Sequence, residues 1–176
     1  MTTASARARN ARAKGHDYER EIARDLRQWL GDDWTVRRLR AHDQRRGHHA
    51  GEFAIDGPFT FPFAIECKSL KTLDLRQLWR TPVDGPMPSW WAQAARQAHG
   101  CSKAPLLVMR VLRGEDLAVL RSASLLGMGL GHWVPQMRLV LPTEDFGVEH
   151  LAAIPWRHLV SVDPAALAEL PSAGAP

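Results

Sequence analysis

A carboxylate and an ammonium group lie two residues apart in the segment Ile65-Glu66-Cys67-Lys68, at the end of an apolar, aromatic stretch. In a strand, side chains alternate between faces, so Glu66 and Lys68 would project from the same side with Cα atoms about 7 Å apart. Carboxylate oxygen binds hard cations such as Mg²⁺, and a bound cation polarises a phosphate and lowers the pKa of its water. A lysine beside it can orient that water or stabilise developing charge. The pair therefore predicts metal-assisted hydrolysis of a phosphodiester.

A single carboxylate is a poor Mg²⁺ site, so a second one is expected nearby. Glu52 and Asp56 are the candidates, since they stand at the two ends of the short stretch that precedes the Glu66 segment. Antiparallel pairing could bring either of them towards Glu66, depending on a register that the sequence leaves open. Cys67 is counted with the metal candidates by its position, although its side chain is expected to enter the core as a small hydrophobe.

Apolar residues at helical spacing predict a helix from His16 to Leu30 that ends at Gly31. Glu19 lies at the border of the apolar stripe, so its carboxylate is expected to face the seam between the helix and the body. Ser89 is expected to be the N-cap residue of a second helix. Strands are expected over residues 34–40, 52–56, 59–67, 105–113, 117–121, 136–141 and 156–162.

A last short helix is expected after Asp163-Pro164. The order of helices and strands predicts an α/β fold in which a mixed central β-sheet is flanked by α-helices.

Positive charge is concentrated in the first part of the chain. Residues 1–50 hold twelve Lys and Arg against seven Asp and Glu, whereas residues 111–176 hold four against seven. Most of the 23 basic residues are arginine, whose planar fork suits phosphate. This distribution indicates a polyanionic partner, with a solvated basic surface as the plain alternative. The candidate DNA contacts are Lys14, Arg37, Arg38, Arg45, Arg46, His48 and His49.

Several classes of protein are disfavoured by composition. No apolar run approaches the roughly 18 residues that span a bilayer, and the first residues lack the apolar stretch of a secretory signal. The two cysteines form no Cys-x-x-Cys pair, which disfavours a disulfide framework or structural zinc site. The sequence therefore predicts a protein of a reducing cytoplasm, in a bacterium or a phage-infected host.

Five short motifs occur in order and together resemble the PD-(D/E)XK nuclease superfamily, within it the archaeal-type Holliday junction resolvases and their phage-encoded relatives. They are Lys14-Gly15, Tyr18-Glu19-Arg20-Glu21, Val36-Arg37-Arg38, Gly51-Glu52-Phe53 and Ile65-Glu66-Cys67-Lys68. The resemblance covers roughly residues 14–112 and implies a restriction-endonuclease-like core.

Carried over residue by residue, the resemblance implies that Glu52, Glu66 and Glu19 hold Mg²⁺ or Mn²⁺, that Lys68 positions water, and that Gln93 assists from a helix behind the sheet. Glu52 stands where the family usually has Asp, and the gap to Glu66 is long for the motif. Both departures keep Asp56 as a rival.

The function implied by the resemblance is resolution of four-way DNA junctions in recombination and repair. A homodimer would place two sites about a two-fold axis, nick symmetric strands and leave 5′-phosphate ends. Two alternatives remain: another phage recombination, repair or restriction-like nuclease, and a non-catalytic DNA-binding module with a degraded site. In organisation, a flexible basic arm is expected over 1–14, a nuclease core over 15–135, and a C-terminal extension packed on that core over 136–176.

Overall fold

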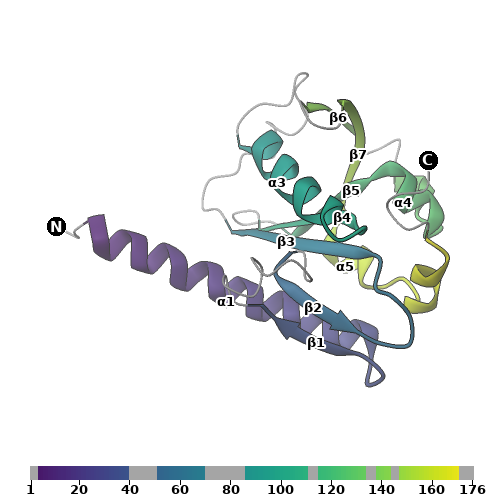
Figure 1. Cartoon of the computed structure of the whole chain (residues 1–176), viewed down its shortest axis with the longest axis horizontal. Helices are drawn as coiled ribbons and strands as arrows, with labels where there is room; N and C mark the ends of the chain where they lie inside the picture. The colour runs from purple at the N-terminus through teal and green to yellow at the C-terminus, as the bar shows by residue number, and fades with distance from the viewer. Residues whose placement is uncertain are drawn as a thin grey trace.

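The computed structural model describes residues 4–39, 51–69, 86–110, 115–133, 138–143 and 147–170. Its main element is a five-stranded sheet in which a parallel pair is followed by antiparallel neighbours, so the expected mixed sheet is confirmed. In spatial order the strands are β3 (Phe63–Ser69), β4 (Ala104–Arg110), β5 (Leu117–Arg121), β7 (Gly147–Pro155) and β6 (Arg138–Thr143) (Figure 1).

A separate two-stranded ribbon lies beside the first strand of this sheet. It consists of β1 (Thr35–Arg38) and β2 (Phe53–Asp56), paired antiparallel so that Arg38 lies opposite Phe53 and Thr35 opposite Asp56. The backbone N–H of Glu52, just before β2, donates to the carbonyl of Ile65 in β3 at 2.8 Å. The start of β2 is thereby attached to the strand that carries Glu66.

Helices cover both faces of the main sheet, and alternate strand residues divide the apolar side chains between two clusters. On one face, Leu106 and Val108 of β4 pack with α1 (Ala4–Leu30). On the other, Leu107 and Met109 pack against α3 (Met87–His99). The shorter helices are α4 (Ser122–Gly127), η2 (Gly131–Trp133), α5 (Trp156–Leu159) and η3 (Pro164–Glu169).

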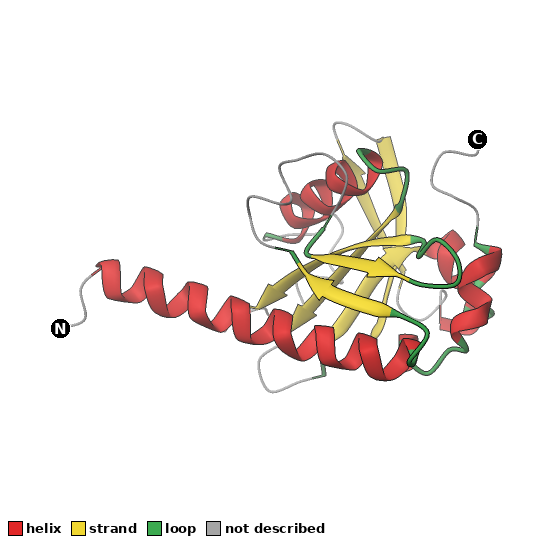
Figure 2. Ribbon diagram, turned by 60° about the horizontal axis from the view of Figure 1, so that its bottom comes forward, coloured by secondary structure: helices red, strands yellow, loops and turns green. Residues whose placement is uncertain are grey.

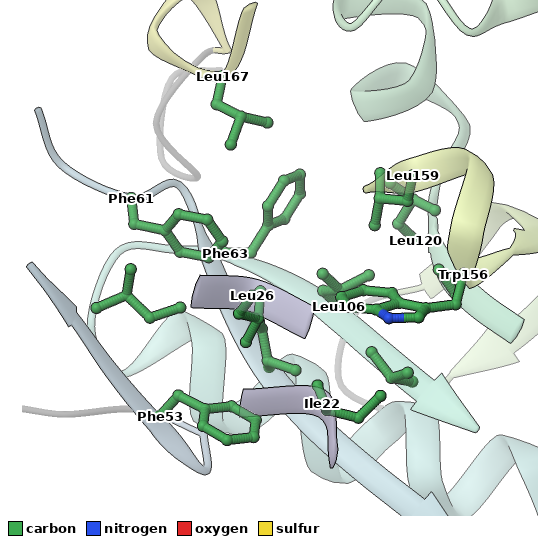
Figure 3. Packing of buried hydrophobic residues seen from close by; sticks show 14 of the residues in the cluster. Ile22, Leu26, Phe53, Phe61, Phe63, Leu106, Leu120, Trp156, Leu159 and Leu167 are labelled. Carbon is green, nitrogen blue, oxygen red and sulfur yellow. The ribbon is translucent and has the colours of Figure 1, made fainter. Parts of the chain in front are cut away.

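The larger cluster joins residues that are distant in the sequence. Ile22 and Leu26 of α1 meet Phe53, Phe61 and Phe63 at one end (Figure 3). Among the C-terminal residues of the cluster, Trp156 and Leu159 lie at its other end, whereas Leu167 lies near Phe61 and Phe63 (Figure 3). The cluster therefore joins α1 to residues from the middle and from the C-terminal part of the chain.

The first helix begins earlier than the sequence predicted, at Ala4 instead of His16. From residue 13 onward, where side chains are described, the first buried position is Tyr18, and the N-terminal part of the helix extends beyond the body of the molecule (Figures 1 and 2). The expected loose arm over 1–14 is therefore corrected to helix from Ala4 onward. The reason lies in composition, since alanine and arginine are among the best helix formers. At the other end Gly31 has a positive φ of 83°, as its predicted role as a helix stop requires.

The C-terminal third differs from expectation. Residues 156–162 were expected to form a strand, but Trp156–Leu159 is a helical turn and the strand is β7, directly before it. Because β7 pairs with both β5 and β6, it is an interior strand of the sheet rather than an extension packed on the core. Glu149 and His150 interrupt the apolar pattern in the first half of β7, which obscured the strand in the sequence.

Two further details concern α3 and the character of the helices. The helix begins at Met87, and the Ser89 hydroxyl donates to the Pro86 carbonyl at 2.8 Å, so Ser89 is a first-turn residue and not the predicted N-cap. Among the described helices, none combines the length and the apolar character that crossing a bilayer requires.

Candidate active site

The end of β3 and the middle of α3 form a compact polar group against the sheet. Lys68 Nζ donates to Glu66 Oε1 at 2.5 Å and to Gln93 Oε1 at 3.1 Å. Gln93 Nε2 donates to the same Glu66 oxygen at 2.8 Å. The Glu66 side chain is 5% exposed and that of Lys68 is 22% exposed, so the ion pair opens to solvent on the lysine side. The predicted common face of Glu66 and Lys68 is confirmed.

Glu52 lies beside this group, on the opposite edge of β3 from β4. Its backbone is fixed by the bond to Ile65, and its Oε2 accepts a hydrogen bond from the Cys67 backbone N–H at 2.9 Å. Gly51, one residue earlier, has a φ of +82°, and a Cβ there would lie 2.4 Å from the Ile65 carbonyl oxygen. Only glycine allows the chain to approach β3 this closely, and that approach brings Glu52 to the site.

Asp56 lies at the far end of β2, away from Glu66. In the antiparallel register it is opposite Thr35, and its carboxylate is 3.7 Å from the exposed Arg37 guanidinium. Of the two rival carboxylates, the structure therefore brings Glu52 to the end of β3 that carries Glu66.

The environment of Glu52 is strongly unfavourable for its negative charge. Burial, followed by the charges of Glu66 and Glu19, raises the pKa of Glu52 to about 8 from its ordinary 4.5, against the hydrogen bond from Cys67 that lowers it. The carboxylates of Glu66 and Glu19 are thus close enough to Glu52 for their charges to raise its pKa.

Cys67 contributes its backbone to the site and its side chain to the core. The thiol belongs to the large apolar cluster, and burial, followed by the charge of Glu52, raises its pKa well above the usual value. A thiol that keeps its proton is a poor ligand for a hard cation, which prefers oxygen. Burial of the thiol therefore disfavours the prediction that Cys67 binds metal, while its backbone N–H holds Glu52.

Glu19 faces the same region from α1, as its place on the border of the apolar stripe predicted, and it is paired within the chain. Its Oε2 accepts from Arg38 Nη1 at 2.7 Å, and the same Nη1 is 2.5 Å from His16 Nδ1. Because arginine only donates, that histidine nitrogen is the acceptor. Arg38 was predicted as a DNA contact, but no pattern in the sequence indicated its pairing with Glu19, 19 residues away.

The donor set suits a hard divalent cation such as Mg²⁺ or Mn²⁺. Within the described part of the chain, no three His, Cys, Asp or Glu side chains already form a cage for a metal ion. Glu52 and Glu66 nevertheless lie close enough that, after burial, the charge of Glu66 is the next cause that raises the pKa of Glu52. A cation is the counter-charge that such a group calls for. Glu52 and Glu66, with Glu19 beyond them, are the residues that would hold it.

A sequence comparison identifies the family to which this site belongs. The family described as "Phage putative PDDEXK endonuclease" matches residues 10–143. The chain belongs to this family of phage endonucleases. The matched range contains Glu19, Glu52, Glu66, Lys68 and Gln93, whereas β7 lies beyond it.

Among solved structures, this phage endonuclease family member is similar to Hjc, a Holliday junction resolvase from the archaeal hyperthermophile Archaeoglobus fulgidus. The TM-score is 0.44 and the sequence identity 13%, over 85% of this chain and 97% of that one. No protein of curated function matches the chain in sequence.

The predicted DNA contacts of the endonuclease fall into three groups. Lys14 and Arg37 have exposed side chains, as phosphate contacts would need. Arg38 is half-buried against Glu19. The remaining four, Arg45, Arg46, His48 and His49, lie outside the described residues.

A second polar network, at the end of β4, was missed by sequence reasoning. Arg110 lies 4.3 Å above the centre of the Tyr18 ring, contacts Glu21 and bonds to both carboxylate oxygens of Asp116 at 3.2 and 3.3 Å. Arg110 is opposite Ser69, the last residue of β3. The network therefore ties α1 to the end of β4. No local motif indicates it, because Tyr18 and Glu21 are about 90 residues away from Arg110 in the sequence.

Proposed function

We propose that this endonuclease is a Mg²⁺- or Mn²⁺-dependent enzyme that resolves four-way DNA junctions. In this proposal the chain acts as a homodimer, cuts two symmetric strands and leaves 5′-phosphate ends. The observation that carries the proposal is the mutual hydrogen bonding of Glu66, Lys68 and Gln93. Beside it, the carboxylate of Glu52, just before β2, is bound to the backbone N–H of Cys67. This pattern supplies a cation-binding carboxylate pair and a positioned ammonium group within a family of endonucleases.

Each residue has a role that follows from its contacts. Glu52 and Glu66 would hold the cation, which when bound supplies a Lewis acid at the scissile phosphate. Lys68 places Nζ beside the buried Glu66 carboxylate, and its partly exposed end can orient the attacking water. Gln93 holds both partners from α3, so neither turns away when water enters. Glu19 contributes its charge from α1, directly or through water.

Support for a junction as the substrate is separate and comes from the ordered motif series between Lys14 and Lys68, which resembles that of the archaeal-type resolvases. A second candidate, another phage recombination or repair nuclease, is favoured by the family description, which names an endonuclease and no junction. The two proposals share one active site and differ only in the shape of DNA that reaches it.

Purified protein should be incubated with a synthetic four-way junction and with linear duplexes of the same arm sequences, in Mg²⁺ and in EDTA. Symmetric nicks confined to the junction, ligatable without phosphorylation, support the resolvase proposal; cutting of both substrates favours the second candidate. Glu66→Gln is the matched control, because it keeps the size of the side chain and removes its charge. Tight DNA binding with no Mg²⁺-dependent cutting in wild type would leave a DNA-binding module and reject both enzymes.

A further inference from the structure

Arg38 pairs with Glu19, a carboxylate of the proposed metal site, and is the more exposed partner of the two. Its guanidinium holds Glu19 at 2.7 Å, yet the Arg38 side chain is 31% exposed and that of Glu19 is 17% exposed. Arg38 is also the last residue of β1, opposite Phe53, which follows Glu52. One cation of the chain therefore neutralises a carboxylate whose charge reaches Glu52.

We propose that Arg38 exchanges the carboxylate of Glu19 for a phosphate of the DNA, so that Glu19 is released to the metal site only when DNA is bound. This inference rests on the proposed function and adds a mechanism by which substrate assembles the site. Before DNA arrives, Glu19 is occupied by Arg38 and the cation has two carboxylates, Glu52 and Glu66. Afterwards it has three.

Two physical features favour such an exchange. A partly exposed ion pair is weak because water competes for both charges, so it can be replaced at small cost. A phosphate offers the guanidinium two oxygens in the planar geometry that arginine prefers, whereas in the structure only one oxygen of Glu19 is bound by Arg38. His16 Nδ1 also contacts Nη1 of Arg38. In this proposal His16 keeps the guanidinium close to Glu19 both before and after DNA binds.

The exchange predicts thermodynamic coupling between metal and DNA. If DNA binding frees a ligand for the cation, the cation must strengthen DNA binding by the same factor. The exchange predicts that loss of Arg38 strengthens metal binding to the DNA-free protein. If Arg38 only orients Glu19, its loss would leave the Glu19 side chain without a fixed position and would weaken metal binding. The direction of the change in the DNA-free protein therefore separates the two roles.

The test uses Ca²⁺ as the probe, since it has the oxygen preference of Mg²⁺, with gels run on the same samples to verify that the DNA stays intact. Calorimetry measures Ca²⁺ binding to the free protein, and fluorescence anisotropy measures junction binding in Ca²⁺ and in EDTA at fixed ionic strength. For Arg38→Gln, Ca²⁺ affinity without DNA is expected to rise about fivefold or more, the lower end of typical coupling factors. The strengthening of DNA binding by Ca²⁺ seen in wild type is expected to vanish.

Arg37→Gln is the matched control, because Arg37 is the adjacent, exposed residue of the same strand and pairs with Asp56 instead. It is expected to lose some DNA affinity and keep the full effect of Ca²⁺. If Arg38→Gln does not fold, His16→Ala gives the second measurement: His16 is exposed, and without it the guanidinium is held less firmly, so free-protein Ca²⁺ affinity should again rise. Unchanged or weaker Ca²⁺ binding in the folded variant overturns the exchange. Wild-type cleavage, measured separately, decides the proposed function.

Discussion

The Glu52 carboxylate accepts a hydrogen bond from the backbone N–H of Cys67 at 2.9 Å, so a side chain before β2 is bound to the main chain of β3. Cys67 lies between Glu66 and Lys68, and its N–H points towards β2 while their side chains point towards α3. A glutamate is one methylene longer than an aspartate, and Glu52 spans this distance while the charge of Glu66 still reaches it. Its carboxylate is thereby kept near Glu66.

Removal of the Glu52 carboxylate is expected to abolish most cleavage, whereas removal of the Asp56 carboxylate is not. Glu52→Ala deletes one of the two carboxylates proposed to hold the cation and should lower the single-turnover rate on a four-way junction about a hundredfold or more. Asp56→Ala loses only an exposed contact with Arg37 and should stay within about twofold of wild type. A larger loss of rate in Asp56→Ala than in Glu52→Ala would mean that Glu52 is not the second metal ligand.

Glu52 also makes the stability of the metal-free protein depend on pH. Its pKa is about 8 in the folded protein and 4.5 ordinarily, so between these values the folded state binds more protons than the unfolded state. The free energy of unfolding in EDTA should therefore fall as pH rises from 4.5 to about 8. The cost of holding a charged Glu52 carboxylate in the folded state is absent below this range and complete above it.

Glu52→Gln, which keeps an acceptor for the Cys67 N–H, should remove this dependence. Each pKa unit corresponds to about 1.4 kcal/mol. Removing part of the cost of the buried Glu52 charge should therefore stabilise the variant by about 2 kcal/mol at pH 8.5 and by little at pH 5. Urea unfolding at both pH values checks this, with the exposed Asp56→Asn as control. Parallel pH profiles for wild type and Glu52→Gln would contradict the assignment.

Gly51→Ala is expected to damage both stability and activity. Its Cβ would lie 2.4 Å from the Ile65 carbonyl oxygen and 2.8 Å from the Ile65 nitrogen, so β2 must move away from β3 and carry Glu52 with it. Gly129 is the matched control, because its φ of +73° imposes the same backbone strain with no atom within 4 Å of the added Cβ. Gly129→Ala should cost about 1–2 kcal/mol, and Gly51→Ala roughly twice as much. Equal losses in urea unfolding would show that the close approach is unimportant.

Gln93→Ala is expected to lower the rate of cleavage while leaving DNA affinity nearly unchanged. The amide bonds to both Glu66 and Lys68, and hydrogen bonds to charged groups contribute about 1.5–3 kcal/mol. A 10- to 100-fold loss in the single-turnover rate follows from this range, about tenfold per 1.4 kcal/mol. Gln28→Ala, an exposed glutamine on α1, should have no effect. A loss confined to DNA affinity would instead make Gln93 a substrate contact.

Local periodicity was sufficient to predict the parts of the site that depend on one element. The spacing of Tyr18, Ile22 and Leu26 predicted the packed part of α1 and the border position of Glu19. Alternation along one strand predicted the common face of Glu66 and Lys68. Both follow from the geometry of a single helix or strand.

Relations between elements were beyond the sequence. The choice between Glu52 and Asp56 depended on the register of β1 with β2 and on the bond to Ile65. The Arg38–Glu19 pair joins a strand to a helix, and charge alone suggested only that Arg38 meets phosphate. Contacts of this kind are set by tertiary packing, which leaves no periodic pattern.

The continuity of α1 fixes a phase between its two ends. Lys14 and Glu19 share one uninterrupted helix, so the direction of one relative to the other is determined by the number of residues between them. One residue inserted between Gly15 and Tyr18 would leave the packed half in place but rotate everything before it by about 100° and displace it by about 1.5 Å. A substitution between Gly15 and Tyr18 therefore preserves the direction of Lys14 relative to Glu19, whereas a change in the length of this stretch alters it.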